Sequence, residues 1–156
     1  MEYKVSDEDG LYARAKHRAL YLIERRDYTR KEIHDKLKKS GKYEDSIIER
    51  VLNFLEEYHF LDDREYAHKY IRTYGPRRSR KQIEYDLERK GVNRDCVRLA
   101  MEELELDDAY SLERLIEKRL RGKELPKEEK NKQYNYFLRK GYSYEQIRKV
   151  LDNYMK

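Results

Sequence analysis

Basic side chains gather at two corresponding points of the sequence, each beside the expected start of a short helix. The first group is Arg25, Arg26, Arg30 and Lys31, and the second group, about fifty residues further on, is Arg77, Arg78, Arg80 and Lys81. Backbone N–H groups at a helix start already favour anions. Guanidinium groups strengthen this preference because they form paired hydrogen bonds with phosphate or carboxylate. The recurrence predicts non-covalent recognition of an anionic partner.

A third basic group lies in the last third of the chain and comprises Lys118, Arg119, Arg121 and Lys123. Residues 109–156 contain 13 basic and 7 acidic residues, whereas the whole chain has a net charge of +5. A positive surplus concentrated in one part of a molecule attracts polyanions. The three groups are therefore the candidate partner-binding or DNA-binding residues. A solvated helical surface is the alternative interpretation of the same charges.

Sixteen tyrosines and no tryptophan provide possible stacking partners for nucleic acid bases. The helical periodicity places most of these tyrosines on core-facing positions, including Tyr66 and Tyr70. Tyr28, Tyr74 and Tyr144 fall in expected turns instead, so we predict that these three rings are more accessible.

The chain contains no pattern typical of an enzyme site. The four histidines form no metal-ligand spacing with one another or with the single cysteine, Cys96; they are His17, His34, His59 and His68. A P-loop, a glycine-rich dinucleotide motif and a nucleophile elbow are absent from the sequence. Aspartate pairs occur at 62–63 and 107–108, but both stand where a helix needs an N-terminal cap. The sequence predicts a binding protein rather than an enzyme, with no cofactor and no metal.

The segment SRKQIEYDLERKG, residues 79–91, predicts one short helix. Ser79 can cap its start, with Gln82 as the capping-box partner three residues later. Ile83 and Leu87 lie four residues apart on one face, and Gly91 offers the left-handed conformation that ends many helices.

The same pattern recurs about fifty residues upstream, in 29–41, with Thr29 as cap and Gly41 as terminator. A weaker copy ends at Gly141, where Phe137 takes the place of the core leucine and we expect Pro126 to start the helix. Other helices are predicted from apolar periodicity at 13–26, 45–59, after the aspartates at 62–63, from 93 to 104, over 112–120, and after Ser143. The sequence therefore predicts three copies of a three-helix unit.

The predicted fold is all-α, with three tandem three-helix repeats stacked into an elongated, curved array. The expected boundaries are a flexible lead-in at 1–12 and repeats at 13–63, 64–108 and 109–156. With 44% charged and 38% hydrophobic residues, several small cores fit this composition better than one large core. The single cysteine and the absence of a long apolar run favour a cytoplasmic protein.

Five short motifs follow one another in a fixed order along the chain. They are Ala19-Leu20 with Arg25 or Arg26; Thr29 with Glu32-Ile33 and Leu37; Phe60-Leu61-Asp62-Asp63 with Tyr66-Ala67; Ile83 and Leu87 with Lys90-Gly91-Val92; and Leu138-Arg139-Lys140-Gly141-Tyr142. Their order and spacing resemble the RecX regulatory proteins of bacteria, over about residues 13–153. The third repeat departs from the family pattern because the helix before Phe137 is unusually polar.

The resemblance implies a non-enzymatic regulator of the RecA recombinase, with roles in recombination, DNA repair and the SOS response. RecX proteins bind RecA and its filament on single-stranded DNA, and they suppress ATP hydrolysis and strand exchange. The implied partners are therefore RecA and the RecA–DNA filament. The charge distribution also predicts weak, non-specific binding of nucleic acid. We expect a monomer and no membrane partner.

Two other classes of protein remain as alternatives. Three-helix units resemble helix-turn-helix modules, so the chain could read duplex DNA directly. The helices that would enter the groove, at 45–59 and 93–104, carry mixed charge, which argues against this interpretation. A peptide-binding scaffold of the tetratricopeptide type would require two-helix units with a period of about 34 residues, which the sequence lacks.

Overall fold

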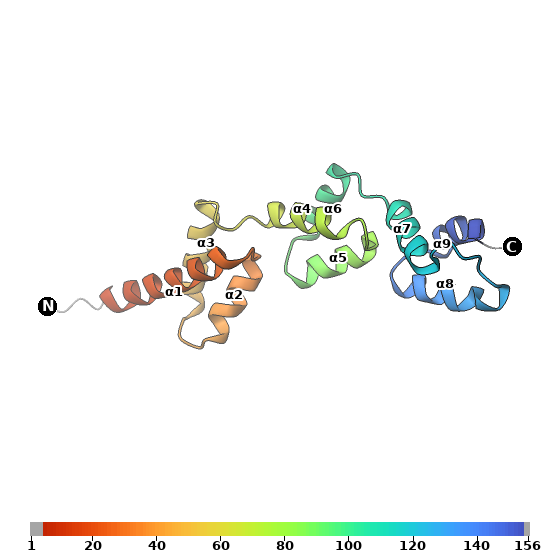
Figure 1. The fold of residues 1–156 in the computed structure, drawn as a ribbon. Coiled ribbons are helices and arrows are strands. Elements are labelled where there is room, and N and C mark those ends of the chain that lie inside the picture. Colours follow the sequence, from red (N-terminus) through yellow and green to blue (C-terminus); the bar gives the residue numbers. More distant parts are fainter. Residues whose placement is uncertain (1–4, 155–156) are drawn as a thin grey trace. The chain divides into compact units, whose positions relative to one another are not determined.

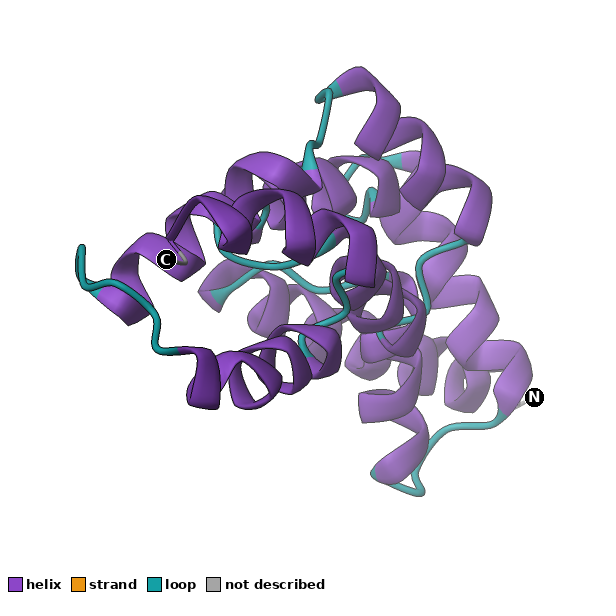
Figure 2. Cartoon of the chain, turned by 90° about the vertical axis from the view of Figure 1, so that its right-hand side faces the viewer, coloured by secondary structure: helices purple, strands orange, loops and turns teal. Residues whose placement is uncertain are grey.

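The computed structural model describes residues 5–154, with side chains from Asp7 onward, and this part of the chain contains nine α-helices, two short 3-10 helices and no strand (Figure 1). Figure 2 shows that loops join the helices. The α-helices are α1 (Val5–Arg25), α2 (Arg30–Lys39), α3 (Asp45–Glu57), α4 (Asp63–Tyr74), α5 (Arg80–Arg89), α6 (Arg94–Glu103), α7 (Asp108–Leu120), α8 (Lys130–Arg139) and α9 (Tyr144–Leu151). The all-α class and the three-helix units are confirmed.

By compactness the chain divides into two units. The first comprises the described residues up to Tyr66 together with Arg89–Asn93, and the second comprises Ala67–Glu88 and the described residues from Arg94 onward. The elongated, curved arrangement of the repeats and their boundaries at 63/64 and 108/109 stay predictions.

Side-chain caps explain several helix boundaries. The Thr29 hydroxyl accepts from the Glu32 N–H, and the Glu32 carboxylate accepts from the Thr29 N–H, which completes a capping box at α2. Ser143 and Gln146 form the same box at α9. At α5 the Ser79 hydroxyl accepts from the Gln82 N–H at 3.0 Å, but the Gln82 side chain donates to Asp86 instead. The three serine or threonine caps are confirmed.

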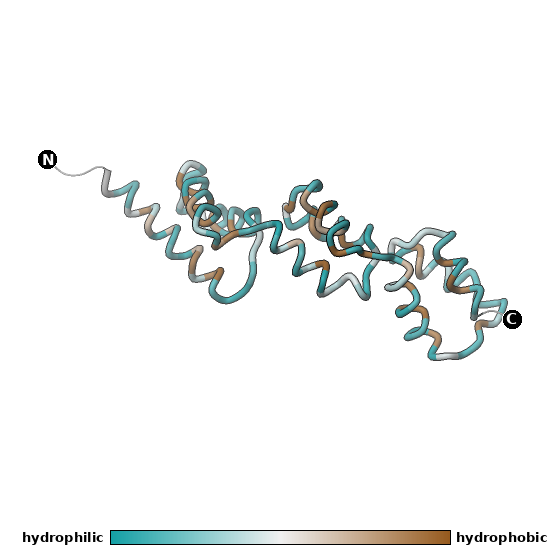
Figure 3. The backbone as a smooth tube through the Cα atoms, turned by 90° about the horizontal axis from the view of Figure 1, so that it is seen from above, coloured by the Kyte–Doolittle hydropathy of each residue, from teal (hydrophilic) through white to brown (hydrophobic). Residues whose placement is uncertain are grey.

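Each compact unit contains a small apolar core. In the first unit, apolar residues of α1, α2 and α3 pack together; they include Ala15, Ala19, Ile33, Leu37, Ile48, Val51 and Leu55, all fully buried. In the second unit, α7, α8 and α9 form a cluster around Leu112, Ile116, Phe137, Ile147 and Leu151. Figure 3 shows apolar residues, in brown, interspersed with polar residues along the helices. Ile83 and Leu87 of α5 are also fully buried, so the predicted stripe is confirmed.

The N-terminal helix is longer than predicted. We expected a flexible lead-in over residues 1–12, but α1 begins at Val5; residues 1–4 lie outside the described residues. Asp7 and Glu8 in its first turn favour a helix start, and Leu11 and Tyr12 pack against the first core. These apolar contacts extend the helix beyond the region that periodicity alone predicts. In the third copy of the pattern, Pro126 precedes a 3-10 turn, Lys127–Glu129, and α8 follows at Lys130.

Candidate nucleic-acid interface

The starts of α2 and α5 are already occupied by carboxylates of the same chain. The Arg30 N–H donates to Asp63 at 3.0 Å, and the Arg80 N–H donates to Asp108 at 2.7 Å. Burial raises the pKa of Asp63, and the hydrogen bond from the Arg30 N–H opposes that rise. An internal aspartate therefore satisfies one backbone N–H group at each of these helix starts. That the basic groups beside them bind an anionic partner stays a prediction.

The capping hydroxyls at these two helix starts make a second, equivalent contact. Thr29 donates its hydroxyl hydrogen to the backbone carbonyl of Lys90 at 2.5 Å, within the first unit. Ser79 donates in the same way to the carbonyl of Lys140 at 2.8 Å, within the second unit. Both capping residues are fully buried. We call this pair of contacts, the hydroxyl–carbonyl bond and the N–H–aspartate bond, the cap joint.

The two aspartates of each pair make different contacts, and the difference is the same in both pairs. Asp62 caps α4 by accepting from the Glu65 N–H, and Asp107 caps α7 by accepting from the Ala109 N–H. The capping interpretation of the pairs is confirmed for these first members. The second members, Asp63 and Asp108, belong to the cap joints, a role that sequence spacing did not reveal.

In the first basic group, most of the charge is already paired. Arg30 binds Glu49 at 2.6 Å, Glu56 and Asn53, all on α3. Lys31 pairs with Asp35 at 2.8 Å. The Arg26 guanidinium lies 3.8 Å from the centre of the Tyr28 ring and 4.0 Å from a Glu32 carboxylate oxygen. The Arg25 guanidinium lies 4.0 Å from the centre of the Tyr21 ring. This group therefore offers less free charge than its composition suggests.

The second basic group is only partly paired. Arg78 donates to the Tyr70 hydroxyl at 2.7 Å and to Asp86 at 2.9 Å, and its guanidinium lies 4.0 Å from the Tyr74 ring centre. Burial, together with the hydrogen bond to Asp86, raises the pKa of Tyr70 to about 12. Arg77 is exposed and stacks at 4.9 Å on Tyr74. This network holds Arg78 in one orientation beside Arg77.

The two other members of this group, Arg80 and Lys81, lie in different surroundings. Arg80 donates to the Leu106 carbonyl at 3.2 Å, so its side chain is used within the second unit. Lys81 is exposed on the first turn of α5. It lines a hollow with mixed charges that is described below.

The third basic group surrounds the end of α7. Lys118, Lys123 and Arg121 are exposed, and Arg121 ends the helix in the left-handed conformation with φ 50°. Arg119 donates to the buried side chain of Gln133 at 2.6 Å. Its guanidinium lies 3.6 Å from the centre of the Tyr136 ring. Arg119 therefore reaches α8, whereas the other three remain on the solvent side.

A cavity of about 460 Å³ brings parts of these groups together within the second unit. It is lined by Arg77, Arg78, Ser79, Gln82, Asp86, Leu115, Tyr136, Lys140 and Tyr142. Arg119 contacts it through Tyr136, and the Lys140 ammonium lies 5.4 Å from the same ring. We call this site the basic cavity. Sequence spacing missed Lys140 and Tyr136 as site residues, although Lys140 stands directly before Gly141 as Lys90 does before Gly91.

The exposure of the tyrosines differs in part from the sequence prediction. Tyr28 is 9% exposed and belongs to the first core, so its predicted accessibility is wrong. Tyr66 and Tyr70 are half-buried rather than core residues, because their hydroxyls reach polar groups. Tyr144 is 55% exposed, as predicted, whereas Tyr74 is half-buried beneath two arginines.

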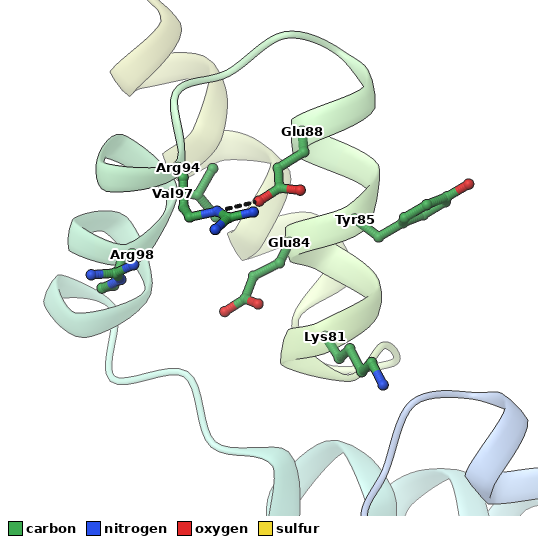
Figure 4. A pocket seen from close by; sticks show the side chains of 7 residues that line it. All are labelled: Lys81, Glu84, Tyr85, Glu88, Arg94, Val97 and Arg98. Atoms are coloured by element: carbon green, nitrogen blue, oxygen red, sulfur yellow. Dashed lines mark hydrogen bonds and ion pairs between the residues drawn. The ribbon is translucent and has the colours of Figure 1, made fainter.

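A second hollow, of about 430 Å³, lies between α5 and α6 (Figure 4). Figure 4 shows Arg94 paired with Glu88, at 2.9 Å, with Glu84 beside them. Its wall carries three basic side chains, Lys81, Arg94 and Arg98, and two acidic ones, Glu84 and Glu88. With a surplus of only one positive charge and with Arg94 paired to Glu88, this hollow is a weaker candidate for binding phosphate.

Within the described residues, no group of three or more histidine, cysteine, aspartate or glutamate side chains is placed to hold a metal ion. Among the described helices, none combines the length and the apolar composition needed to span a bilayer.

Three family models match the chain in order. The first three-helix domain of RecX matches residues 15–55, the second matches residues 62–101 and the third matches residues 107–151. A curated relative named regulatory protein RecX, from Clostridium tetani, is 33% identical over 156 residues, which cover 97% of this chain and 72% of the relative. Another protein of that name, from Vibrio parahaemolyticus, is 35% identical over 136 residues, which cover 85% of this chain and 86% of the relative.

Solved structures show the same fold. The crystal structure of RecX from Lactobacillus salivarius aligns with a TM-score of 0.75 at 22% identity, covering 93% of this chain and 97% of that one. A second crystal structure, of a regulatory protein RecX, aligns with a TM-score of 0.77 at 23% identity, covering 91% of this chain and 73% of that one. The three domain matches and the curated relatives together place the chain: it belongs to the RecX family of regulatory proteins.

Proposed function

We propose that this protein binds RecA and the RecA filament on single-stranded DNA, and that it inhibits ATP hydrolysis and strand exchange without catalysing a reaction itself. The observation that carries the proposal is the match of all three RecX domains, in order, along this chain. In this proposal the protein acts as a monomer in the cytoplasm, in recombination and DNA repair.

The basic cavity supports the nucleic acid part of this proposal. Arg77 and Lys140 have no acidic partner among the described side chains, and Arg119 bonds only to the neutral Gln133 and stacks on Tyr136. Unpaired cations can neutralise phosphates, which supplies affinity without sequence preference. We therefore propose weak, salt-sensitive binding to single strands, with Arg77, Lys140 and Arg119 making the largest contribution. The exposed cations Lys118, Arg121 and Lys123 add to the surrounding positive field.

The alternative, a direct reader of duplex DNA, receives less support. The helix that would enter the major groove in the first repeat, α3, carries four acidic residues and one basic residue. Its acids Glu49 and Glu56 bind Arg30, which draws that arginine away from any phosphate. The corresponding helix α6 has three acidic and two basic residues. Both helices would meet the negatively charged groove unfavourably.

The deciding experiment measures DNA-dependent ATP hydrolysis by RecA from the same bacterium, as this protein is added in increasing amounts. A regulator of the filament should slow hydrolysis well below one molecule per RecA protomer, because a bridging or growth-blocking molecule affects many protomers. A simple competitor for DNA would act only near full coverage of the strand. Absence of inhibition at every dose, with the protein shown to be folded, would overturn the proposal.

A charge variant tests the part played by the basic cavity. The double substitution Arg77→Glu with Lys140→Glu should raise the dose needed for inhibition, because both side chains are exposed cations on the cavity. Lys42→Glu is the control, since Lys42 is an exposed lysine of the first unit outside the basic cavity. If the control weakens inhibition as strongly per charge as the cavity variant, net charge rather than the cavity is responsible.

A further inference from the structure

The inside and the rim of the basic cavity carry different chemistry. Leu115 and Tyr136 provide an apolar and an aromatic surface, while Gln82 and Asp86 provide hydrogen-bonding groups. The cations that lack an acidic partner among the described side chains, Arg77 and Lys140, are exposed. The inner wall thus suits a planar, polar and uncharged group, and the rim suits an anion.

Asp86 determines which ligand groups can bind against the inner wall. Its carboxylate receives hydrogen bonds from Arg78 and the Tyr70 hydroxyl, both at 2.9 Å, and from Gln82 at 2.8 Å. Arg78 in the same wall neutralises the charge of this carboxylate. An ionised carboxylate only accepts hydrogen bonds, so the N–H edge of a nucleobase can donate to it whereas a phosphate cannot. A phosphate is therefore favoured at the rim and a base inside.

The ring that would stack with a base is held in place. Arg119 covers Tyr136 at 3.6 Å, and Phe137 packs edge-on against it at 5.1 Å between ring centres. A ring fixed in this way loses little rotational freedom when a ligand stacks on it. The cavity volume of about 460 Å³ lies within the range of roughly 300 to 1,000 Å³ that is usual for small-molecule sites.

We propose that the basic cavity is a subsite for one nucleotide of a single strand, with its base against Tyr136 and its phosphate on Arg77 and Lys140. A single strand fits because its bases are accessible, whereas a paired base must first be unstacked at a cost of a few kcal/mol. This inference rests on the nucleic acid binding proposed above, and it adds that a base, as well as the backbone, is recognised.

The test compares two labelled single strands of about 15 nucleotides, one of thymidine nucleotides and one abasic throughout, by fluorescence anisotropy at equal salt. The strands carry the same number of phosphates, so their difference in affinity reports base contacts alone. The intact protein should bind the base-bearing strand about 5- to 100-fold more tightly, as expected for stacking of one base on an aromatic ring.

Three variants locate the base contact. Tyr136→Ala should remove most of this difference, because the stacking surface is lost, and Tyr136→Phe should keep the difference. Tyr85→Ala is the matched control, because Tyr85 is a tyrosine that is 56% exposed and lines the other hollow beside α5 (Figure 4). If Tyr136→Ala does not fold, Leu115→Trp fills the cavity from α7 and should also remove the difference.

The outcomes separate this inference from the proposed function. Equal affinity of the intact protein for the two strands overturns the base subsite but leaves phosphate binding standing; this is also the result expected if the cavity receives a protein side chain. Retention of the difference by every cavity variant that folds overturns it as well. Absence of salt-sensitive binding to either strand removes the nucleic acid part of the proposed function itself.

Discussion

The hydroxyl of Tyr142 lies in the second core, 2.8 Å from the Ser111 hydroxyl, and the residue is only 2% exposed. Burial raises its pKa from 10.0 to about 12, although the Ser111 hydrogen bond acts in the opposite direction. Between these two values the unfolded chain loses the phenolic proton and the folded chain keeps it. Ionisation then favours unfolding, so stability falls as the pH rises through this interval.

Tyr142→Phe should isolate this effect. Near neutral pH the variant should be less stable by about 1 kcal/mol, because it lacks the hydrogen bond to Ser111. Relative to the wild type it should gain about 2 to 3 kcal/mol between about pH 9 and pH 12, since it has no phenol to ionise. Urea unfolding at several pH values measures the difference. A difference that stays constant with pH would contradict the raised pKa.

At this scale, sequence patterns predicted roles that depend on near neighbours. The caps Thr29, Ser79 and Ser143 were predictable because the bonded N–H lies only three residues away. The partners of the arginines were not, since Arg30 binds α3 and Arg119 binds α8. Lys140 and Tyr136 were missed as site residues because the periodicity predicts which face of a helix is buried but not which side chains of another helix lie opposite.

At the scale of elements, corresponding glycines end α2 and α5 in different surroundings. Gly41 has φ +72°, and a Cβ added there would meet no atom within 4 Å. Gly91 has φ +86°, and a Cβ added there would collide with the Lys31 side chain. The first position requires only a left-handed backbone, whereas the second also requires the absence of a side chain.

Alanine substitutions should separate these two requirements. Gly41→Ala should cost about 1 to 2 kcal/mol, the usual penalty for a left-handed residue with a Cβ. Gly91→Ala should cost about 1 to 3 kcal/mol more, because the methyl group overpacks the contact with Lys31. Thermal unfolding of both variants decides the point, and equal losses would mean that the loop after α5 does not pack on α2.

Helix positions were more predictable than helix lengths. The starts of α2, α3, α5 and α9 lie where capping residues and apolar periodicity place them. The early start of α1 at Val5 was missed, because its first turns are polar and are stabilised by the packing of Leu11 and Tyr12 on the core. The 3-10 turn before α8 was likewise not visible in the pattern of residues.

For the whole molecule, the net charge of +5 is a poor guide to the charge available to a polyanion. Arg30 and Arg77 count equally in that sum. Arg30, however, binds two glutamates, whereas the Arg77 guanidinium stacks on a ring and has no acidic partner among the described side chains. Cations already paired within the protein release few counterions when a partner binds, so only the unpaired ones should appear in the salt dependence.

Two substitutions of equal formal charge test this distinction. Arg77→Ala should reduce the slope of log affinity for single-stranded DNA against log salt by about 0.7, with little change in stability. Arg30→Ala should leave the slope unchanged and lower the stability by about 1 kcal/mol, the usual size for partly exposed ion pairs. Binding between about 50 and 200 mM salt and urea unfolding provide the two measurements. The account fails if both variants change the slope alike.

The cap joint has a consequence for how such a chain can change over evolutionary time. The acceptor of its hydroxyl hydrogen bond is the main-chain carbonyl of Lys90 or Lys140. Every amino acid carries such a carbonyl. A substitution at either lysine therefore demands no matching substitution at Thr29 or Ser79. Pairs of alignment columns should then show no covariation across this contact, and contact maps inferred from covariation should omit it. A joint made in this way tolerates wide divergence of the side chains around it and still sets the register of one helix against the next loop.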